Sequence, residues 1–343
     1  MSEVVAIRCY TGARVGAGHL MRCRELARQL KARGCGTIIV GPPEAMRDEQ
    51  DSGLFDVWHE ASAEFEALSD ARAFTDLCAE SDVRYAIMDD YRISPDYQHI
   101  LEAAGLRWLQ QFDSSRPWSF WADILVNAGP HEQAANYAPF LKNPKTQILF
   151  GPEFAVLRPE FTAVRPQPNR RDVRSLFLSF GGGDDAGLIM KSVDALRPLL
   201  GENFRLVIAS GRSNPGNVGY VREFSEEFYI DFCIAPPDMA TLMCNCDLAL
   251  LAGGTMSYEA AICGLPLILV SVADNQERAC KGWQERIGAI YLGRADALSQ
   301  PTIRDTVMGL IADGEAREEM ASLGRAAVDG RGATRLIDAL LDG

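Results

Sequence analysis

The residue types and spacing that could do chemistry are densest in the third quarter of the chain. Gly253 and Gly254 follow an apolar run, Thr255 opens a helical pattern, and Glu259 lies four residues later on the same helix face. Glycines let a backbone approach an anion closely, and the free N–H groups at a helix start favour negative charge. The order predicts a phosphate-binding turn with Thr255 as a good N-cap. A tight turn beside an ordinary surface glutamate is the structural alternative.

Two amide side chains, Asn275 and Gln276, come after the next apolar run, residues 267–270. In open α/β sheets, ligand contacts gather beyond the carboxyl ends of parallel strands, so we expect both amides beside the phosphate site. One carboxylate and two amides suit the ribose and base of a nucleotide. The sequence therefore predicts a nucleotide site formed by Gly253, Gly254, Thr255, Glu259, Asn275 and Gln276.

A second candidate site follows the first apolar run. Gly16 and Gly18 lead into His19, and Arg22 comes one helical turn later. A dinucleotide-binding fingerprint would need a third glycine where Met21 stands and an acid after the second strand, and both are missing. We therefore expect a glycine loop that presents His19 at a helix N-terminus, as a neutral imidazole able to act as a general base. A helix-capping histidine bonded to a backbone carbonyl is the structural alternative.

Two further segments place polar groups or glycines after predicted strands. Asp89 and Tyr91 could point a carboxylate and a phenol at a ligand, although an aspartate that caps the next helix explains the pattern equally. Gly181 and Gly182 could direct backbone amides at a diphosphate or could form a flexible turn. We group Asp89 and Tyr91 with His19 as predicted catalytic residues, and Gly16, Gly18, Arg22, Gly181 and Gly182 with the predicted substrate-binding residues.

The elements that must position these side chains alternate between strand and helix throughout the chain. This alternation predicts an α/β protein with two doubly wound, parallel-sheet domains that face a central cleft, where ligands gather. The expected strands are 4–9, 37–40, 85–88, 108–110, 124–126, 175–179, 206–209, 228–233, 248–251, 267–270 and 289–291. The expected helices are 19–33, 65–80, 96–104, 187–200, 237–244, 255–263, 276–287, 303–313, 315–328 and 333–341.

A polar segment separates the two predicted domains. Residues 165–172 contain two prolines and three arginines between apolar segments, which is typical of an interdomain linker. We expect an N-terminal domain at 1–164 that carries the histidine loop, and a C-terminal nucleotide-binding domain at 173–343. The last helix could pack back on the N-terminal domain.

Composition excludes several classes of function. The 343 residues carry a formal charge of −13, so there is no basic stripe for nucleic acid. We expect neither a membrane span nor a signal peptide, because the apolar runs are too short and the N-terminus lacks the pattern. Nine scattered cysteines indicate reduced core residues and a cytoplasmic protein. We expect no metal site and no cofactor, and composition leaves the oligomeric state open.

Together these segments resemble the UDP-sugar hydrolases of pseudaminic acid biosynthesis and the related spore-coat polysaccharide proteins, both of which look like GT-B glycosyltransferases. The resemblance is carried by residues 16–19, 21–23, 89, 91, 151–161, 180–182 and 252–276, which span most of the chain. It implies a GT-B-like fold and a nucleotide-sugar substrate. It also places His19 on the catalytic histidine and Glu259, Asn275 and Gln276 on nucleotide-binding positions.

The reaction implied by the resemblance is metal-free hydrolysis. A water activated by His19 attacks the anomeric carbon of a diacetamido-trideoxy sugar, and UDP departs with its charge held by the amides of residues 253–255. The sequence departs from the family at Tyr10, where an aspartate is usual, so a carboxylate that could orient the sugar or support the histidine is absent there. Alternative functions are a GT-B glycosyltransferase with a UDP-sugar donor, or a non-catalytic nucleotide-sugar-binding homologue.

Overall fold

The computed structural model describes all residues except 1–2, 11–17, 63, 113–117, 164–171 and 343, and it divides the chain into two compact units. Unit 1 consists of Met1–Arg158 with Gly330–Gly343, and unit 2 of Pro159–Asp329. The units therefore divide before the expected linker 165–172, of which only Asp172 lies within the described residues. The residues from Gly330 onward belong to the first unit, although they are far from it in sequence.

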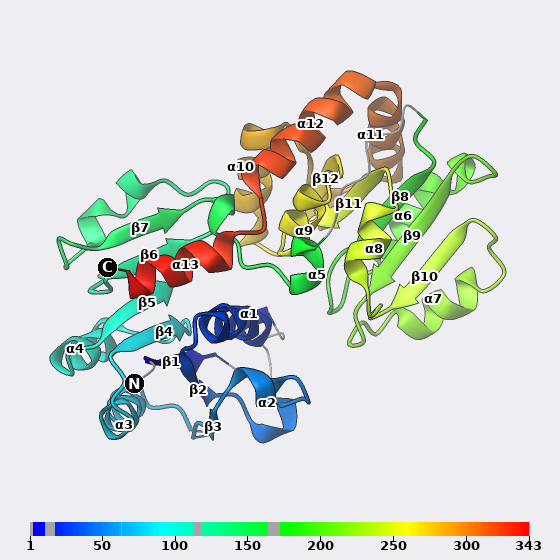
Figure 1. Ribbon diagram of the computed structural model, residues 1–343. Coiled ribbons are helices and arrows are strands. Elements are labelled where there is room, and N and C mark those ends of the chain that lie inside the picture. Colours follow the sequence, from blue (N-terminus) through cyan, green and yellow to red (C-terminus); the bar gives the residue numbers. More distant parts are fainter. Residues whose placement is uncertain (1–2, 11–17, 63, 113–117, 164–171, 343) are drawn as a thin grey trace. The chain divides into compact units, whose positions relative to one another are not determined.

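Unit 1 is built on a seven-stranded sheet in the order β3-β2-β1-β4-β5-β6-β7, and all of its paired strands are parallel (Figure 1). The strands are β1 (Val4–Cys9), β2 (Gly36–Gly41), β3 (Val57–Glu60), β4 (Tyr85–Asp89), β5 (Arg107–Gln111), β6 (Ile124–Asn127) and β7 (Gln147–Phe150). The strand order reverses between β1 and β4. The carboxyl ends of these two strands form the switch point at which such sheets bind ligands.

Helices cover both faces of this sheet. Because successive side chains of a strand point to opposite faces, Val5 and Ile7 pack with residues of the first and last helices of the unit, whereas Ala6 packs with residues of the third and fourth. The helices are α1 (Gly18–Ala32), α2 (Asp51–Leu54), α3 (Ala67–Glu80), α4 (Pro95–Ala103) and α13 (Gly332–Leu341). Packing against the sheet fixes the N-terminus of α1 beside the ends of β1 and β4.

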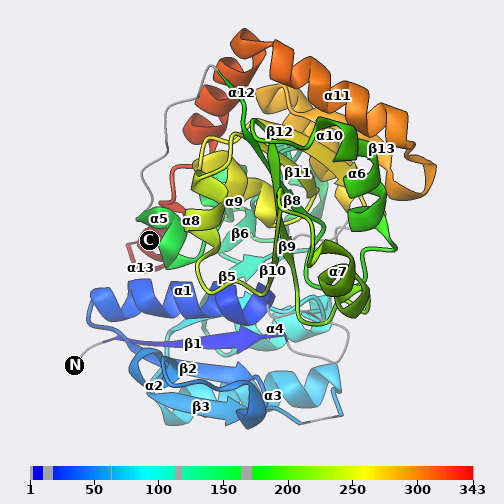
Figure 2. The same cartoon turned by 90° about the vertical axis from the view of Figure 1, so that its right-hand side faces the viewer.

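Unit 2 repeats the architecture with six parallel strands in the order β10-β9-β8-β11-β12-β13. The strands are β8 (Ser175–Ser179), β9 (Arg205–Ser210), β10 (Ile230–Ile234), β11 (Leu248–Ala252), β12 (Leu267–Ser271) and β13 (Ile290–Arg294). The helices are α5 (Pro159–Thr162), α6 (Leu188–Leu196), α7 (Asn217–Phe224), α8 (Met239–Cys244), α9 (Met256–Ile262), α10 (Gln276–Ile287), α11 (Gln300–Ala312) and α12 (Gly314–Ala327). Figure 2 shows α7 beside the edge strand β10.

The structure confirms two doubly wound parallel sheets and adds two strands that the sequence did not predict. Both β3 and β7 are edge strands whose residues are largely exposed or half-buried, so neither produces an apolar run. The predicted helix 237–244 begins only at Met239, because Asp238 caps it by accepting from Thr241 N. Among the described residues, no helix is long and apolar enough to cross a bilayer.

Candidate functional site

The switch point of unit 1 brings His19 and Asp89 together. His19 lies in the first turn of α1, Asp89 ends β4, and His19 Nδ1 lies 2.7 Å from Asp89 Oδ1. The structure thus supports neither structural alternative for these residues. The His19 side chain faces a carboxylate instead of a backbone carbonyl, and α4 is capped by Ser94 instead of Asp89.

Arg22 completes this group one helical turn after His19. Its Nε and Nη2 atoms donate to the two carboxylate oxygens of Asp89, at 2.8 and 2.6 Å. Burial of Asp89 opposes ionisation, but the charge of Arg22 and the hydrogen bonds from His19 and Arg22 outweigh burial and lower the pKa of Asp89 to about 2. The sequence grouped Arg22 with the substrate-binding residues, whereas the structure places its guanidinium on a carboxylate of the protein.

The ionised carboxylate determines which nitrogen of His19 carries hydrogen. A carboxylate without a proton can only accept, so Nδ1–H of His19 donates to Asp89 Oδ1. In a neutral ring this leaves Nε2 with the free lone pair that a general base needs. The sequence indicated that a supporting carboxylate was lost at Tyr10. That inference was wrong for the histidine, because Asp89 supplies the carboxylate.

Two tyrosines surround the imidazole. The ring of Tyr91 lies 4.7 Å from that of His19 and the ring of Tyr10 lies 5.6 Å away, both in edge contact, and the two tyrosine rings are 5.8 Å apart. Tyr91 is 41 % exposed, but His19 is only 5 % exposed and is therefore more enclosed than the sequence indicated. Gly16 lies outside the described residues. Gly18 begins α1, and an added Cβ there would meet no atom of the described residues within 4 Å.

A buried charge network is formed by Arg8, Asp70, Asp90 and Arg92, next to the carboxyl ends of β1 and β4. The sequence did not predict it. Arg8 donates to both oxygens of Asp70 at 2.9 and 2.8 Å and lies 3.6 Å from Asp90. Arg92 donates to both oxygens of Asp90 at 2.9 and 2.7 Å. The available signal was Arg8 itself, a charged residue within the apolar run of β1 that is only 1 % exposed.

In unit 2, the predicted phosphate turn lies between β11 and α9. A Cβ on Gly253 would overlap Cys280 Sγ, so α10 leaves no room there for a side chain. At Gly254, by contrast, the nearest atom would be Gln276 Nε2 at 3.8 Å. The Ser257 hydroxyl donates to Gly254 O at 2.7 Å, which fixes the turn to the first residues of α9. The structure therefore explains Gly253 by packing. The N–H groups of Gly253 and Gly254 donate to Val270 O and Ala252 O at 3.1 and 2.8 Å, so among the described residues only the Thr255 N–H of the three expected amides stays available to a phosphate.

The remaining predicted nucleotide-binding residues flank this turn. Thr255 holds the N-cap position of α9, as the sequence predicted, but its side chain makes no capping hydrogen bond. Glu259 is 4 % exposed rather than a surface residue. Gln276 Oε1 accepts from Val272 N at 3.0 Å, which holds the loop after β12 closed, while Asn275 is exposed.

The glycine loop after β8 has a structural explanation. Gly181 has a φ of +107°, which L side chains rarely adopt, and a Cβ on Gly211 would overlap the backbone of Gly182. Asp185 accepts from the backbone N–H groups of Gly187 and Ile189 at 3.3 and 2.8 Å. A carboxylate of the protein therefore already occupies the N-terminus of α6. A diphosphate was one of the two possibilities that the sequence left open for this loop.

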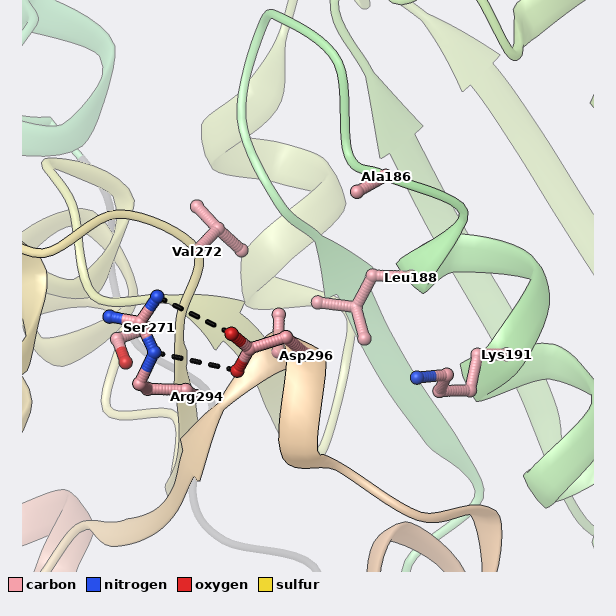
Figure 3. Close-up of a pocket in the computed structure, with 8 residues that line it drawn as sticks. Ala186, Leu188, Lys191, Ser271, Val272, Arg294 and Asp296 are labelled. Carbon is pink, nitrogen blue, oxygen red and sulfur yellow. Dashed lines mark hydrogen bonds and ion pairs between the residues drawn. The ribbon is translucent and has the colours of Figure 1, made fainter.

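A cavity of about 330 Å³ opens at the carboxyl edge of the second sheet (Figure 3). Its charged groups pair with each other, with Asp274 or with the backbone. Arg294 lies 3.4 Å from Asp296, and Lys191 Nζ donates to Leu298 O at 3.2 Å. The residues that line it are Ala186, Leu188, Lys191, Ser271, Val272, Arg294, Ala295 and Asp296. None of the predicted site residues that the structure describes lines this cavity.

Comparison with known proteins gives two relatives of low identity, and no family model matches the chain. It is 27 % identical over 201 residues to the spore coat polysaccharide biosynthesis protein SpsG of Bacillus subtilis (strain 168), covering 57 % of this chain and 59 % of that protein. It is 23 % identical over 299 residues to an uncharacterized protein of Methanocaldococcus jannaschii, covering 84 % of this chain and 60 % of that protein. The chain thus spans about three fifths of the length of the curated relatives it matches.

Solved structures share the fold over the whole chain. MurG of Acinetobacter baumannii matches with a TM-score of 0.72 at 13 % identity, over 100 % of both chains. A putative UDP-N-acetylglucosamine 2-epimerase from Listeria monocytogenes matches with a TM-score of 0.67 at 12 % identity, over 99 % of this chain and 96 % of that one. With its two parallel-sheet α/β units, the protein therefore has a GT-B-like fold.

Proposed function

We propose that this protein is a nucleotide-sugar hydrolase that releases UDP from an activated diacetamido-trideoxy amino sugar, in a pathway resembling pseudaminic acid biosynthesis. The low-identity relative in spore-coat polysaccharide biosynthesis and the fold support a role in nucleotide-sugar metabolism. The single observation that carries the hydrolytic step is the contact between His19 and the ionised Asp89.

In the proposed reaction, Nε2 of His19 accepts a proton from a water molecule as its oxygen attacks the anomeric carbon. The bond between that carbon and the diphosphate oxygen breaks, and UDP leaves with the bonding electrons. Asp89 stabilises the imidazolium that forms and keeps Nδ1 protonated throughout. Arg22 keeps Asp89 ionised, so it acts as a positioning residue, and Tyr91 forms an exposed wall beside the imidazole.

The residues of unit 2 would bind the nucleotide. In the described part of the chain, no side chain caps the start of α9 and the N–H groups of Thr255 and Met256 make no backbone hydrogen bond, so these two can donate to the diphosphate beside Gly254. Glu259, Asn275 and Gln276 would contact the nucleoside. Because the backbone would supply the diphosphate contacts, we propose that the reaction needs no metal ion.

The test is UDP release from a panel of UDP-activated amino sugars, without acceptor and with EDTA present. We expect release from at least one donor, and a fall in kcat of about 100-fold or more for His19→Ala, because a general base contributes that much. His99→Ala is the matched control, since His99 is an exposed histidine of the same unit. Unchanged release by His19→Ala would contradict the proposal, and so would a requirement for a divalent metal.

A GT-B glycosyltransferase is the second candidate, favoured by structural neighbours such as a rhamnosyltransferase, SpnG, with a TM-score of 0.66. In that case His19 would deprotonate an acceptor hydroxyl, and UDP release would depend on the acceptor. Donor binding with no release under any condition would instead indicate a non-catalytic nucleotide-sugar-binding protein.

A further inference from the structure

Tyr10 and Arg92 form a second group at the switch point of unit 1. Tyr10 directly follows β1, and Arg92 lies three residues after the end of β4. The guanidinium carbon of Arg92 is 4.4 Å from the centre of the Tyr10 ring, and the Tyr10 ring is in edge contact with His19. A substituent of a sugar that reacts at His19 can therefore reach both side chains.

The orientation of Arg92 is fixed before any ligand arrives. Its guanidinium lies between two aromatic rings, with Phe65 at 3.8 Å and Tyr10 at 4.4 Å. Its Nε and one Nη nitrogen donate to Asp90, whose side chain is fully buried. Among the described residues, the other Nη nitrogen has no hydrogen-bond acceptor, and the Arg92 side chain remains 28 % exposed. A rigid, partly exposed donor of this kind is suited to one planar oxygen acceptor.

Among the residues that the structure describes, the charges around this donor are balanced. Three guanidinium groups face three carboxylates in the buried charge network and the His19 group: Arg8, Arg22 and Arg92 against Asp70, Asp89 and Asp90. An added carboxylate or phosphate would leave one negative charge uncompensated. A neutral carbonyl oxygen would take the free donor without this cost.

We propose that Tyr10 and Arg92 determine specificity by binding an N-acyl group of the sugar. The acyl carbonyl accepts from the free Nη of Arg92, and its methyl group packs on the half-buried Tyr10 ring. A hydroxyl at the same ring position has no methyl group for the tyrosine and a shorter reach to the arginine. The inference rests on the proposed function, because it assumes that the sugar reacts at His19.

The test is calorimetric binding of UDP-N-acetylglucosamine, UDP-glucose and UDP to the full chain. The two sugar nucleotides differ only in an acetamido group in place of a hydroxyl. We expect the wild type to bind the acetamido donor at least about tenfold more tightly than UDP-glucose. Arg92→Lys and Tyr10→Leu should each reduce this preference below about threefold while UDP affinity is unchanged, because the contact lies on the sugar.

The two variants separate loss of selectivity from loss of folding. Arg92→Lys keeps a cation beside Asp90, and Tyr10→Leu leaves that ion pair intact. Arg47→Lys is the matched control, since Arg47 also lies over an aromatic ring, Trp58, and also pairs with a carboxylate, Glu44. Equal wild-type affinity for the two sugar nucleotides would overturn the inference, as would a preference that survives both variants. Absence of UDP release from every donor would instead overturn the proposed hydrolysis and leave these binding ratios measurable.

Discussion

At the scale of single residues, the ionisation of Asp89 controls the state of His19. Asp89 is 1 % exposed, and such a carboxyl group would ordinarily be neutral. The bidentate contact with Arg22 keeps it charged, and the charged form can only accept from His19 Nδ1. The three side chains therefore act together, so losing any one of them changes the other two.

The lowered pKa of Asp89 predicts a stability loss in acid. Its folded-state pKa of about 2 is below the ordinary value of 3.8, so its stabilisation is present above about pH 4 and disappears as the pH falls through 2. We expect about 2 kcal/mol of the free energy of unfolding to be lost over this window in the wild type but not in Asp89→Asn. Urea unfolding from pH 6 to pH 2 measures both.

The control for this experiment is Asp76→Asn, which removes an exposed carboxylate from the same unit. Asp76→Asn should lose stability in acid as the wild type does. If Asp89→Asn followed the same curve as Asp76→Asn, the coupling of Asp89 to Arg22 and His19 would be disproved.

At the scale of elements, the turn between β11 and α9 combines a packing glycine with an accessible one. Gly253 faces Cys280 on α10, which is fully buried and cannot move aside easily. Gly254 has space around it and lies next to the start of α9. The two adjacent glycines of the predicted phosphate turn are thus required for different physical reasons, packing at Gly253 and ligand access at Gly254.

This difference predicts opposite results for two alanine variants. Gly253→Ala should lower the free energy of unfolding by about 1 to 3 kcal/mol, because its Cβ overlaps Cys280 Sγ. Gly254→Ala should change stability by less than about 1 kcal/mol but weaken UDP binding, because a Cβ would keep the diphosphate away from the backbone. Urea unfolding and UDP titration of both variants measure the two effects. Unchanged UDP affinity in Gly254→Ala would argue against a phosphate site at this turn.

At the scale of the whole molecule, unit 1 is completed by a segment from the far end of the chain. Helix α13 packs on α1, and its residues Leu336, Ile337 and Leu340 are fully buried in the same core as Val5. Arg335 donates to Glu153 O at 2.8 Å, and this contact joins the segment to the end of the first stretch of the unit. The core of the unit that carries His19 is therefore complete only when residues 332–341 have joined it.

Removal of one buried side chain from α13 should accordingly destabilise the first unit. We expect Leu336→Ala to lower the free energy of unfolding by about 2 to 5 kcal/mol, the usual cost of a buried leucine. Leu323→Ala in α12 is the control, because Leu323 is 41 % exposed and should change stability by less than about 1 kcal/mol. Limited proteolysis followed by mass spectrometry would locate the destabilised region. Cleavage confined to unit 2 in Leu336→Ala would contradict the conclusion that α13 stabilises unit 1.

The sequence alone determined most of the helices and strands, and the carboxyl edges of the sheets at which ligand-binding residues collect. Apolar runs and helical periods are local signals, so they identified the fold class and placed His19 and Gly254 after strands. Contacts between distant residues have no local signal. Only the tertiary structure paired His19 with Asp89, 70 positions apart, turned Arg22 onto that carboxylate, and placed Arg92 against Tyr10. Sheet order brings these residues together, and sheet order depends on how strands far apart in the sequence pack within one unit.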